Sequence, residues 1–340
     1  MCSMRYVIRL INEYDPGPFP DEFEREVVQL ASNENPFPPS ERVLKAIKES
    51  TLRINRYPYP YYSQLKAELS SYTGVDENRI AVSNGASDII RLVADILLEP
   101  FDRVYIPMPS YTMYLMFSML RDARVETQVF EGYDVDGCHS RGKLAFLCSP
   151  NNPTGNALKK KVIREFLESF EYVVVDEAYA EFHGESCADL LGHYTNLIVI
   201  RSFSKFFGLA GMRIGYALAD ESIAGGIEKI RNPFSISYLG YISAIEAIRS
   251  VDYYRKVADM IISEREKLRQ QLERKFYVYP SRANFLLVKH TEPELVNRLM
   301  EKGVLVRDVT GLEGLHGHHF RVSVGKPEEN SLFLEVVEEI

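Results

Sequence analysis

The chain has 340 residues, 46% of them hydrophobic and 26% charged, which is enough for a sizeable core in one large domain or two ordinary ones. Its 48 acidic residues outnumber its 40 lysines and arginines, and the net charge of −8 argues against nucleic acid as the main partner. The start "MCSMRYVIRL" has no signal-peptide pattern, and no apolar run approaches the roughly 20 residues of a membrane helix. No CxxC pair is formed by the four cysteines, Cys2, Cys138, Cys148 and Cys187. We therefore expect a cytoplasmic protein.

The first forty residues are irregular and rich in proline, as in "YDPGPFP" and "ASNENPFPPS". We expect them to form an arm laid over the surface or over a partner. Ser40 is the expected N-cap of an amphipathic helix that runs to Ser50. A second helix is expected to end at Gly74.

An alternation of short apolar runs and helical patterns follows. Strands without polar alternation, separated by helices, indicate a largely parallel sheet covered on both faces, with ligands bound at the carboxyl ends of the strands. From about 221 to 275 the pattern is mostly helical, and the remaining residues, with a helix at 292–302, indicate a smaller α+β unit. The expected strands are 79–83, 103–107, 143–148, 172–176, 196–200 and 213–219, and the helices between them are 86–98, 110–121 and 158–170.

Two turns follow strands of this sheet. In "NGASD", Gly85 precedes a helix start at Ala86 and Ser87, whose free backbone N–H groups suit an anion. On its own, this motif is better explained as an ordinary glycine turn. In "SPNNPTG", the prolines make a rigid turn that either only reverses the chain or aims the amide of Asn152 into the cleft.

The motif "DEAYAEF" places Asp176 at the end of an apolar strand, where a lone carboxylate is costly unless it is paired. Asp176 is either a helix N-cap or a carboxylate held against a cationic ring nitrogen. Tyr179 is either a core tyrosine or a hydrogen-bond donor to a phenolate oxygen.

The motif "RSFSKFFGLAGMR" places Lys205 after another strand, with the hydroxyls of Ser202 and Ser204 nearby and Arg213 eight residues later. Desolvation and a neighbouring cation lower the pKa of a lysine and make its free amine a nucleophile toward an aldehyde. The apolar "FFGLAGM" that follows disfavours a solvated surface lysine. We therefore expect Lys205 to be reactive.

Together these residues supply an amine, a carboxylate, a phenol, an amide and an anion-binding helix start, which a phosphorylated pyridine aldehyde requires. Here the sequence resembles the fold-type I aminotransferases that use pyridoxal phosphate, with "SPNNPTG", "DEAY" and "SFSKFFGLAGMRIGY" in the expected order. The resemblance implies an α/β fold with a mainly parallel seven-stranded sheet between helices. The implied division is an N-terminal arm with part of the small domain (1–40), a large cofactor-binding domain (41–235) and a small C-terminal α+β domain (236–340).

The resemblance also implies a role for each motif. Lys205 would bind pyridoxal phosphate covalently and later act as the general base, and Asp176 would pair with the ring nitrogen. Tyr179 and Asn152 would hydrogen-bond the ring oxygen, and Tyr111 in "PSYTMY" would stack on the ring. The cofactor phosphate would be held by Gly85, Ala86, Ser87, Ser202, Ser204 and Arg213, and by Tyr57 from the partner subunit of an expected homodimer.

Within this family the sequence is most similar to the histidinol-phosphate aminotransferases, through "YDPG", "ASNENPF", "RYP", "VLVRD" and "FRVSVG". That similarity implies transamination of L-histidinol phosphate with 2-oxoglutarate to imidazole-acetol phosphate and glutamate, a step of histidine biosynthesis. Tyr14, Asn35, Arg307 and Arg321 would bind the substrate. Arginines suit both its phosphate and the carboxylate of glutamate by bidentate hydrogen bonding. Arg307 has the alternative of a surface ion pair with Asp308.

Three alternatives stay open: an aromatic amino-acid aminotransferase, a phosphothreonine decarboxylase of the same fold, or a binding protein that kept the fold without the chemistry. The stretch "GLEGLHGHHF" contains His316, His318 and His319, which lack the spacing of zinc ligands. We expect this stretch to be a loop near the substrate mouth and to bind no metal.

Overall fold

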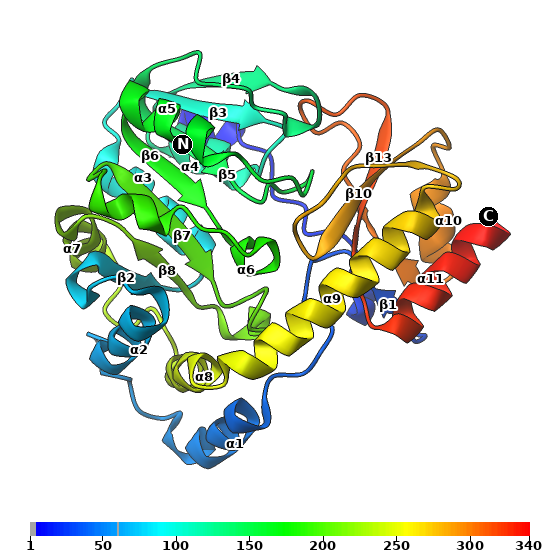
Figure 1. Cartoon of the computed structure of the whole chain (residues 1–340), viewed down its shortest axis with the longest axis horizontal. Helices are drawn as coiled ribbons and strands as arrows, with labels where there is room; N and C mark the ends of the chain where they lie inside the picture. Colours follow the sequence, from blue (N-terminus) through cyan, green and yellow to red (C-terminus); the bar gives the residue numbers. More distant parts are fainter. Residues whose placement is uncertain (1–4, 60) are drawn as a thin grey trace, which may run out of the picture.

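The computed structural model describes residues 5–59 and 61–340. Residues 1–4 of the expected arm, including Cys2, lie outside the described residues. The large sheet and its helices fill the left of Figure 1, and a smaller sheet with two helices fills the right. The helix α9 (Val251–Leu272) runs from the first unit to the second. Among the described residues, no helix combines the length and the apolar character that crossing a bilayer requires.

The large sheet has seven strands in the order β2-β8-β7-β6-β5-β3-β4, and only β8 is antiparallel to its neighbours. This sheet confirms the expected fold class. The sequence predicted every strand of this sheet except β4, whose residues are mostly polar because it lies at the edge and is only partly buried. The strands are β2 (Ile80–Ser83), β3 (Arg103–Met108), β4 (Arg124–Val129), β5 (Gly142–Cys148), β6 (Phe170–Asp176), β7 (Leu197–Ser202) and β8 (Gly215–Leu218).

Helices cover both faces of this sheet, because successive side chains of each buried strand point to opposite faces. On β6, for example, Val175 packs into one core and Val174 into the other. The first core takes helices α2 (Ser63–Thr73), α5 (Lys160–Ser169), α6 (Ala180–His183), α8 (Tyr238–Ile248) and the start of α9. The second core takes α3 (Ala86–Leu97), α4 (Met113–Leu120) and α7 (Glu221–Ile230).

The ends of two helices confirm the expected capping residues. The side chain of Ser40 accepts a hydrogen bond from the backbone N–H of Val43 and so caps α1 (Glu41–Ser50). Gly74 ends α2 with a φ of 73°, a left-handed conformation that glycine adopts without strain. The helices expected at 86–98, 158–170 and 292–302 are the observed α3, α5 and α10 (Leu295–Glu301), each slightly shorter than predicted.

The smaller unit is an antiparallel sheet in the order β12-β13-β10-β9, made of β9 (Tyr277–Val278), β10 (Phe285–His290), β12 (Arg307–Asp308) and β13 (His318–Ser323). Its core is closed by α10, α11 (Pro327–Glu339) and the end of α9. Arg307 and Arg321 are cross-strand partners in this sheet, so their side chains leave the same face. Beside it, β1 (Val28–Gln29) from the arm pairs with β11 (Val304–Leu305).

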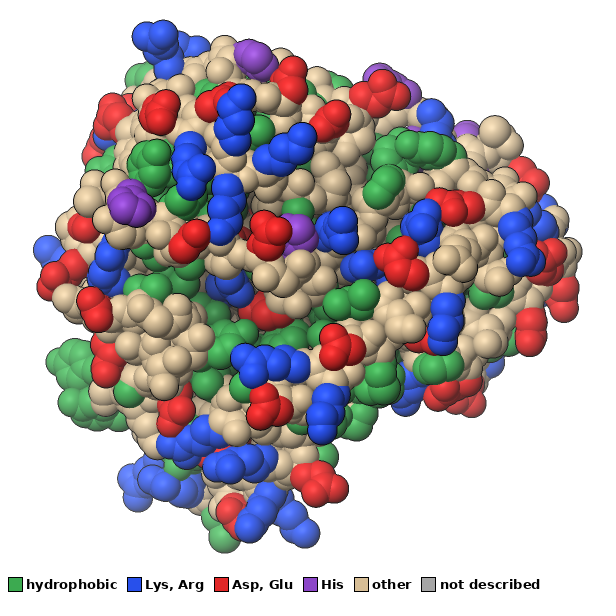
Figure 2. Space-filling view, in the orientation of Figure 1, with side chains coloured by type: hydrophobic (Ala, Val, Ile, Leu, Met, Phe, Trp, Pro, Cys, Tyr) green, Lys and Arg blue, Asp and Glu red, His purple; other side chains and the backbone are tan. Residues whose placement is uncertain are grey.

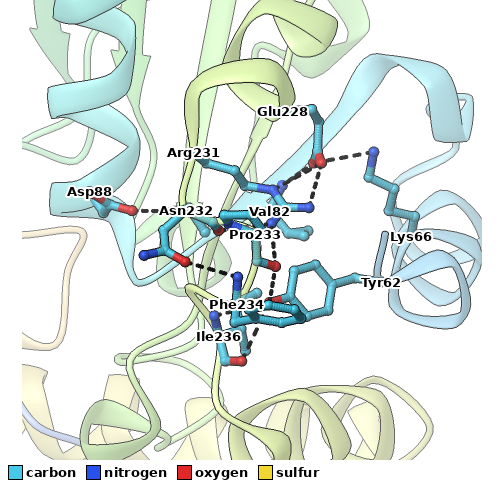
Figure 3. A network of polar contacts seen from close by, with 11 residues as sticks. Tyr62, Lys66, Val82, Asp88, Glu228, Arg231, Asn232, Pro233, Phe234 and Ile236 are labelled. Atoms are coloured by element: carbon cyan, nitrogen blue, oxygen red, sulfur yellow. Dashed lines mark hydrogen bonds and ion pairs between the residues drawn. The ribbon is translucent and has the colours of Figure 1, made fainter. Parts of the chain in front are cut away.

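A polar network joins α2, β2, α7 and the turn after α7 (Figure 3). The carboxylate of Glu228 accepts hydrogen bonds from the backbone N–H of Val82 and from Arg231, and it pairs with Lys66 at 3.2 Å. The guanidinium of Arg231 also lies over the ring of Tyr62. We call these residues the α2–α7 network.

Charges of both signs are interspersed over most of the face that Figure 2 shows, which is typical of a solvated surface. Several exposed large apolar side chains lie in the segment between α1 and α2 or after α7. They are Leu52, Ile54, Tyr57, Tyr59, Tyr61 and Phe234.

Candidate active site

A cavity of about 480 Å³ opens at the carboxyl ends of β5, β6 and β7. Its floor is Cys148, Asp176, Ser202 and Lys205, and Arg321 of β13 closes one side. The other lining residues are Tyr14, Pro16, Phe19, Ser32, Asn33, Glu34, Ala86, Ser87, Tyr111, Tyr114, Asn152, Ala178, Tyr179, Ser204, Ala210, Gly211 and Arg213.

A larger hollow of about 750 Å³ shares no lining residue with this cavity. Three cations stand in its wall, Arg79, Lys160 and Arg201. All three are already bound to carbonyl oxygens or carboxylates of the protein. The smaller cavity is the better candidate site because its ionisable groups keep free hydrogen-bonding capacity.

Asp176 is the last residue of β6 and is almost fully buried. The hydroxyl of Tyr114 donates to its Oδ2 at 2.8 Å, and the backbone N–H of Ala178 donates to its Oδ1 at 3.0 Å. Burial raises the pKa of Asp176 to about 6, while these two hydrogen bonds oppose the rise. Two bonds leave free lone pairs, so the carboxylate can accept a further hydrogen bond.

Lys205 follows β7, and its Nζ donates to the backbone carbonyl of Ser32 at 2.9 Å. Burial, together with the charges of Arg321 and Arg213, lowers the pKa of Lys205 to about 8. A much larger share of this amine is neutral near pH 7 than of an ordinary lysine, so it is a competent nucleophile and base.

A cradle for an anion lies at the start of α3. Gly85 has a φ of 88°, and a Cβ at this position would lie 2.9 Å from Nη2 of Arg213. Arg213 itself has a φ of 54°, which points its side chain back across the turn, and its Nη1 donates to the carbonyl of Ala210. Ser204 lies within 3.5 Å of the same Nη1, so a cation, a hydroxyl and free helix N–H groups converge.

Arg321 links the small sheet to the cavity. Its Nη1 donates to Oδ1 of Asn152 at 2.5 Å and its Nη2 to the carbonyl of Ala31 at 2.8 Å. Its Nε is buried and has no partner among the described residues. The hydroxyl of Tyr179 accepts a hydrogen bond from the amide of Asn33 at 3.1 Å. These contacts place Asn152, Tyr179 and Arg321 around one opening.

Tyr111 stands over the cavity from the start of α4, and its hydroxyl lies 3.2 Å from Oγ of Ser87. Burial raises the pKa of Tyr111 to about 12, so it stays a neutral phenol at physiological pH. Its ring meets the ring of Tyr14 edge-on, at 6.4 Å between centroids. The arm therefore contacts the cavity wall.

Four of the predicted site residues are absent from the cavity wall: Gly85, Asn35, Tyr57 and Arg307. Gly85 instead directly precedes Ala86, which does line the cavity. The amide of Asn35 bonds the carbonyl of Phe206. The guanidinium of Arg307 binds the carboxylate and the carbonyl of Asp15, not Asp308. Tyr57 is 77% exposed and stacks on the ring of Phe234.

Sequence reasoning missed Tyr114, Asn33 and Glu34. Tyr114 lies in the first turn of α4, three residues after Tyr111, which precedes the helix, so its nearness to Tyr111 in the sequence was the available signal. No periodicity exists in the arm that would have pointed to Asn33 or Glu34. Cys148 is 2% exposed and also lies in the cavity wall.

The three histidines do not converge, and of the three only His316 lies in the expected loop, because His318 and His319 begin β13. His319 is buried and its Nε2 lies 3.2 Å from the hydroxyl of Tyr279, whereas His318 points to the opposite face of β13 toward His290. In the part of the chain that the structure describes, no three His, Cys, Asp or Glu side chains are grouped to hold a metal ion.

The seven-stranded sheet, the reactive amine, the buried carboxylate and the anion cradle define a fold-type I transferase of the pyridoxal phosphate class. The pattern of the family "Aminotransferase class I and II" matches residues 25–337. The chain belongs to this family and is an aminotransferase, with pyridoxal phosphate as its cofactor.

The relatives agree with this assignment. The chain is 52% identical to the "Histidinol-phosphate aminotransferase 2" of Archaeoglobus fulgidus, over 99% of this chain and 100% of the relative. It is 38% identical to the histidinol-phosphate aminotransferase of Methanothermobacter thermautotrophicus, over 100% of this chain and 98% of the relative. The histidinol-phosphate aminotransferase of Sinorhizobium meliloti, solved in complex with pyridoxal-5'-phosphate, has the same fold, with a TM-score of 0.86, 24% identity and coverage of 100% of this chain and 98% of that one.

The groups on the cavity wall fit this cofactor. Its aldehyde requires an amine, its ring nitrogen a carboxylate and its phosphate an anion cradle, and the cavity offers Lys205, Asp176 and the turn at Gly85. Only glycine leaves Arg213 its place in that cradle, because a Cβ at Gly85 would collide with the guanidinium.

Proposed function

We propose that this protein transfers the amino group of L-histidinol phosphate to 2-oxoglutarate, giving imidazole-acetol phosphate and glutamate in histidine biosynthesis. The observation that carries the proposal is the meeting of Lys205, Asp176 and Arg321 in one cavity, because it joins an amine and a carboxylate suited to the cofactor with a cation suited to an anionic substrate. The names of the two archaeal relatives support the same substrate.

In this proposal each cavity residue has a defined task. Bound pyridoxal phosphate supplies an aldehyde that takes up the substrate's amine and a ring that withdraws electrons from the α-carbon. Lys205 would hold the cofactor through Nζ, and the same atom, once free, would take the proton from the α-carbon of the substrate. Asp176 keeps a negative charge for the ring nitrogen, and Tyr114 and Ala178 fix the direction of its carboxylate.

The remaining contacts hold the cofactor in place. Tyr111 would cover the ring, and Asn152 and Tyr179 would hydrogen-bond its phenolic oxygen. The phosphate would be bound by Gly85, Ala86, Ser87, Ser202, Ser204 and Arg213.

The substrate's phosphate is assigned to Arg321 and Arg307, with Tyr14 and Asn35 beside them. The two arginines leave the same face of the small sheet, and a free Nε on Arg321 leaves it a donor for an anion. Arg307 must exchange its bond to Asp15 for the phosphate, and Tyr14 lies beside its guanidinium at 6.0 Å. The carboxylate of glutamate would use the same cations.

We also propose that the enzyme is a cytoplasmic homodimer. The exposed apolar cluster at Leu52, Ile54, Tyr57 and Phe234 is the type of surface that a second copy covers, and Tyr57 would then reach the partner's cofactor phosphate. The division into 1–40, 41–235 and 236–340 is part of the proposal: the two sheets fall within the second and third ranges, whereas α8 and the start of α9, from the third range, pack in the core of the large unit. The particle mass measured by sedimentation should be twice the chain mass for the wild type. For Leu52→Glu it should be the mass of a single chain.

A panel of amino donors tests the function. Purified enzyme should form glutamate from 2-oxoglutarate with histidinol phosphate as the best donor, and Arg307→Ala should reduce this activity far more than that with phenylalanine. Equal losses for both donors would exclude the phosphate assignment. Release of CO2 from phosphothreonine would instead indicate the decarboxylase alternative.

A further inference from the structure

The carboxylate of Glu34 lines the cavity but serves no structural purpose there. Glu34 is exposed, and within the described residues its carboxylate takes part in no hydrogen bond or ion pair. The other carboxylate of the cavity wall, Asp176, is held by Tyr114 and Ala178. Glu34 is therefore the acidic group of this wall that is fully available to a ligand.

The backbone that carries Glu34 is fixed on both sides. Asn33 is buried in a left-handed conformation, with a φ of 52°, and its carbonyl accepts a hydrogen bond from the amide of Asn284 at 3.0 Å. Asn35 donates its amide to the carbonyl of Phe206 at 3.0 Å. Two asparagines thus use their side chains or backbone to anchor the turn, while the residue between them presents its charge to the cavity.

The electrostatic setting makes this carboxylate distinctive. The cations of the cavity wall are Lys205, Arg213 and Arg321, which suit phosphate and carboxylate groups. Glu34 has the opposite sign and lies close enough to Lys205 to counteract part of the lowering of its pKa. A ligand that fills this cavity therefore meets cations along most of the wall and one free anion at Glu34.

We propose that Glu34 accepts a hydrogen bond from the ring N–H of a substrate that carries an imidazole. This inference rests on the proposed function, whose substrate joins an imidazole to a phosphate. A neutral imidazole has one N–H donor and a protonated one has two, and a carboxylate binds either more strongly than a neutral acceptor would. Tyr14 and Phe19 of the arm stand in the same wall and supply flat surfaces for the ring.

Glu34 then discriminates between the two amino donors that share the cavity. Glutamate offers no ring N–H and brings a second carboxylate, which Glu34 repels. Glu34 therefore favours histidinol phosphate over glutamate. Its removal must slow the reaction with histidinol phosphate and either speed the reaction with glutamate or leave it unchanged.

The variant Glu34→Gln keeps the size of the side chain and removes its charge. Each half-reaction is measured separately in the loaded enzyme, from the single-turnover absorbance change with histidinol phosphate or with glutamate. We expect kcat/KM for histidinol phosphate to fall by about 10- to 100-fold, as for the loss of a hydrogen bond to a charged group, and kcat/KM for glutamate to stay the same or rise. The ratio between the substrates should therefore change at least about tenfold.

Glu24→Gln is the matched control, since Glu24 is an exposed glutamate of the arm outside the cavity wall. It should leave both half-reactions unchanged. An equal fall for both substrates in Glu34→Gln would overturn the inference, because it would mean a structural effect. Failure of the proposed function is seen separately, as an absence of reaction between histidinol phosphate and the wild-type enzyme.

Discussion

The cofactor cavity and the α2–α7 network are both built from partly buried charged and polar groups, yet they differ in how completely those groups are paired. In the network, the carboxylate of Glu228 is bound by Val82, Arg231 and Lys66 (Figure 3). In the cavity, Asp176 keeps lone pairs free and the buried Nε of Arg321 has no partner among the described residues. Burying unpaired polar groups is unfavourable, so such groups persist where a ligand completes their bonding.

This difference assigns a role to each region. Changes in the network should affect the free energy of unfolding and spare the chemistry. Changes in the cavity should abolish the chemistry at little cost in stability. The two regions can be compared through residues of the same type.

The largest effect is expected for a lysine pair. Lys205→Ala removes the amine that binds the cofactor and moves the proton, so turnover should fall by at least about 10³-fold. After borohydride treatment, the protein mass should no longer include covalently attached cofactor. Lys66→Ala removes an ion pair of the α2–α7 network and should keep normal turnover. A comparable loss of turnover in both variants would contradict the division between the two regions.

A smaller effect, on stability, is expected for Glu228→Ala. The change leaves the N–H of Val82 without its acceptor and takes the shared anion from Lys66 and Arg231, so the free energy of unfolding should fall by about 2–3 kcal/mol. Denaturant titration measures the fall. Lys229→Ala, on the exposed side of the same helix, should stay within about 0.5 kcal/mol of the wild type. Folded Glu228→Ala enzyme should retain its turnover; a specific loss would assign the network a catalytic role.

The smallest effect concerns the pKa of Lys205. In cofactor-free protein, the rate of borohydride-trapped capture of pyridoxal phosphate should rise with pH around a midpoint near 8, because only the neutral amine reacts. Arg321→Gln removes a positive charge that favours the neutral amine, so the midpoint should move upward by roughly one unit or less. Arg307→Gln should leave it in place. A downward shift in Arg321→Gln would contradict this electrostatic account.

Much of the fold and of the cavity follows from the sequence, because the residues after buried parallel strands meet at one edge of a sheet. That rule brings Asp176 and Lys205 together. It does not reach Tyr114, whose contact with Asp176 depends on how α4 packs. Nor does it find Arg307 bound to Asp15, because the two residues lie 292 positions apart and Asp308 is the nearer candidate in the sequence.

The strand β4 and Glu34 escaped prediction for different reasons. The polar residues of β4 suit an edge strand, but they hide it from a search for continuous apolar runs. Glu34 lies in an irregular arm, where a free carboxylate is ordinary in a sequence. Only the folded chain shows that this carboxylate lines the cavity. Positions like this become visible only once the bonds of neighbouring residues such as Asn33 and Asn35 are known.

The helix α9 constrains how the enzyme opens and closes. Its early residues Tyr254 and Ile261 pack in the core of the large unit, and Leu268 and Leu272 pack in the core of the small one. One continuous 22-residue helix is embedded in both cores. A rotation of one unit relative to the other would therefore have to bend this helix and disturb both cores. The irregular segment at Tyr14, Pro16 and Phe19 lines the cavity and belongs to neither core, so a movement of this segment would disturb neither of them.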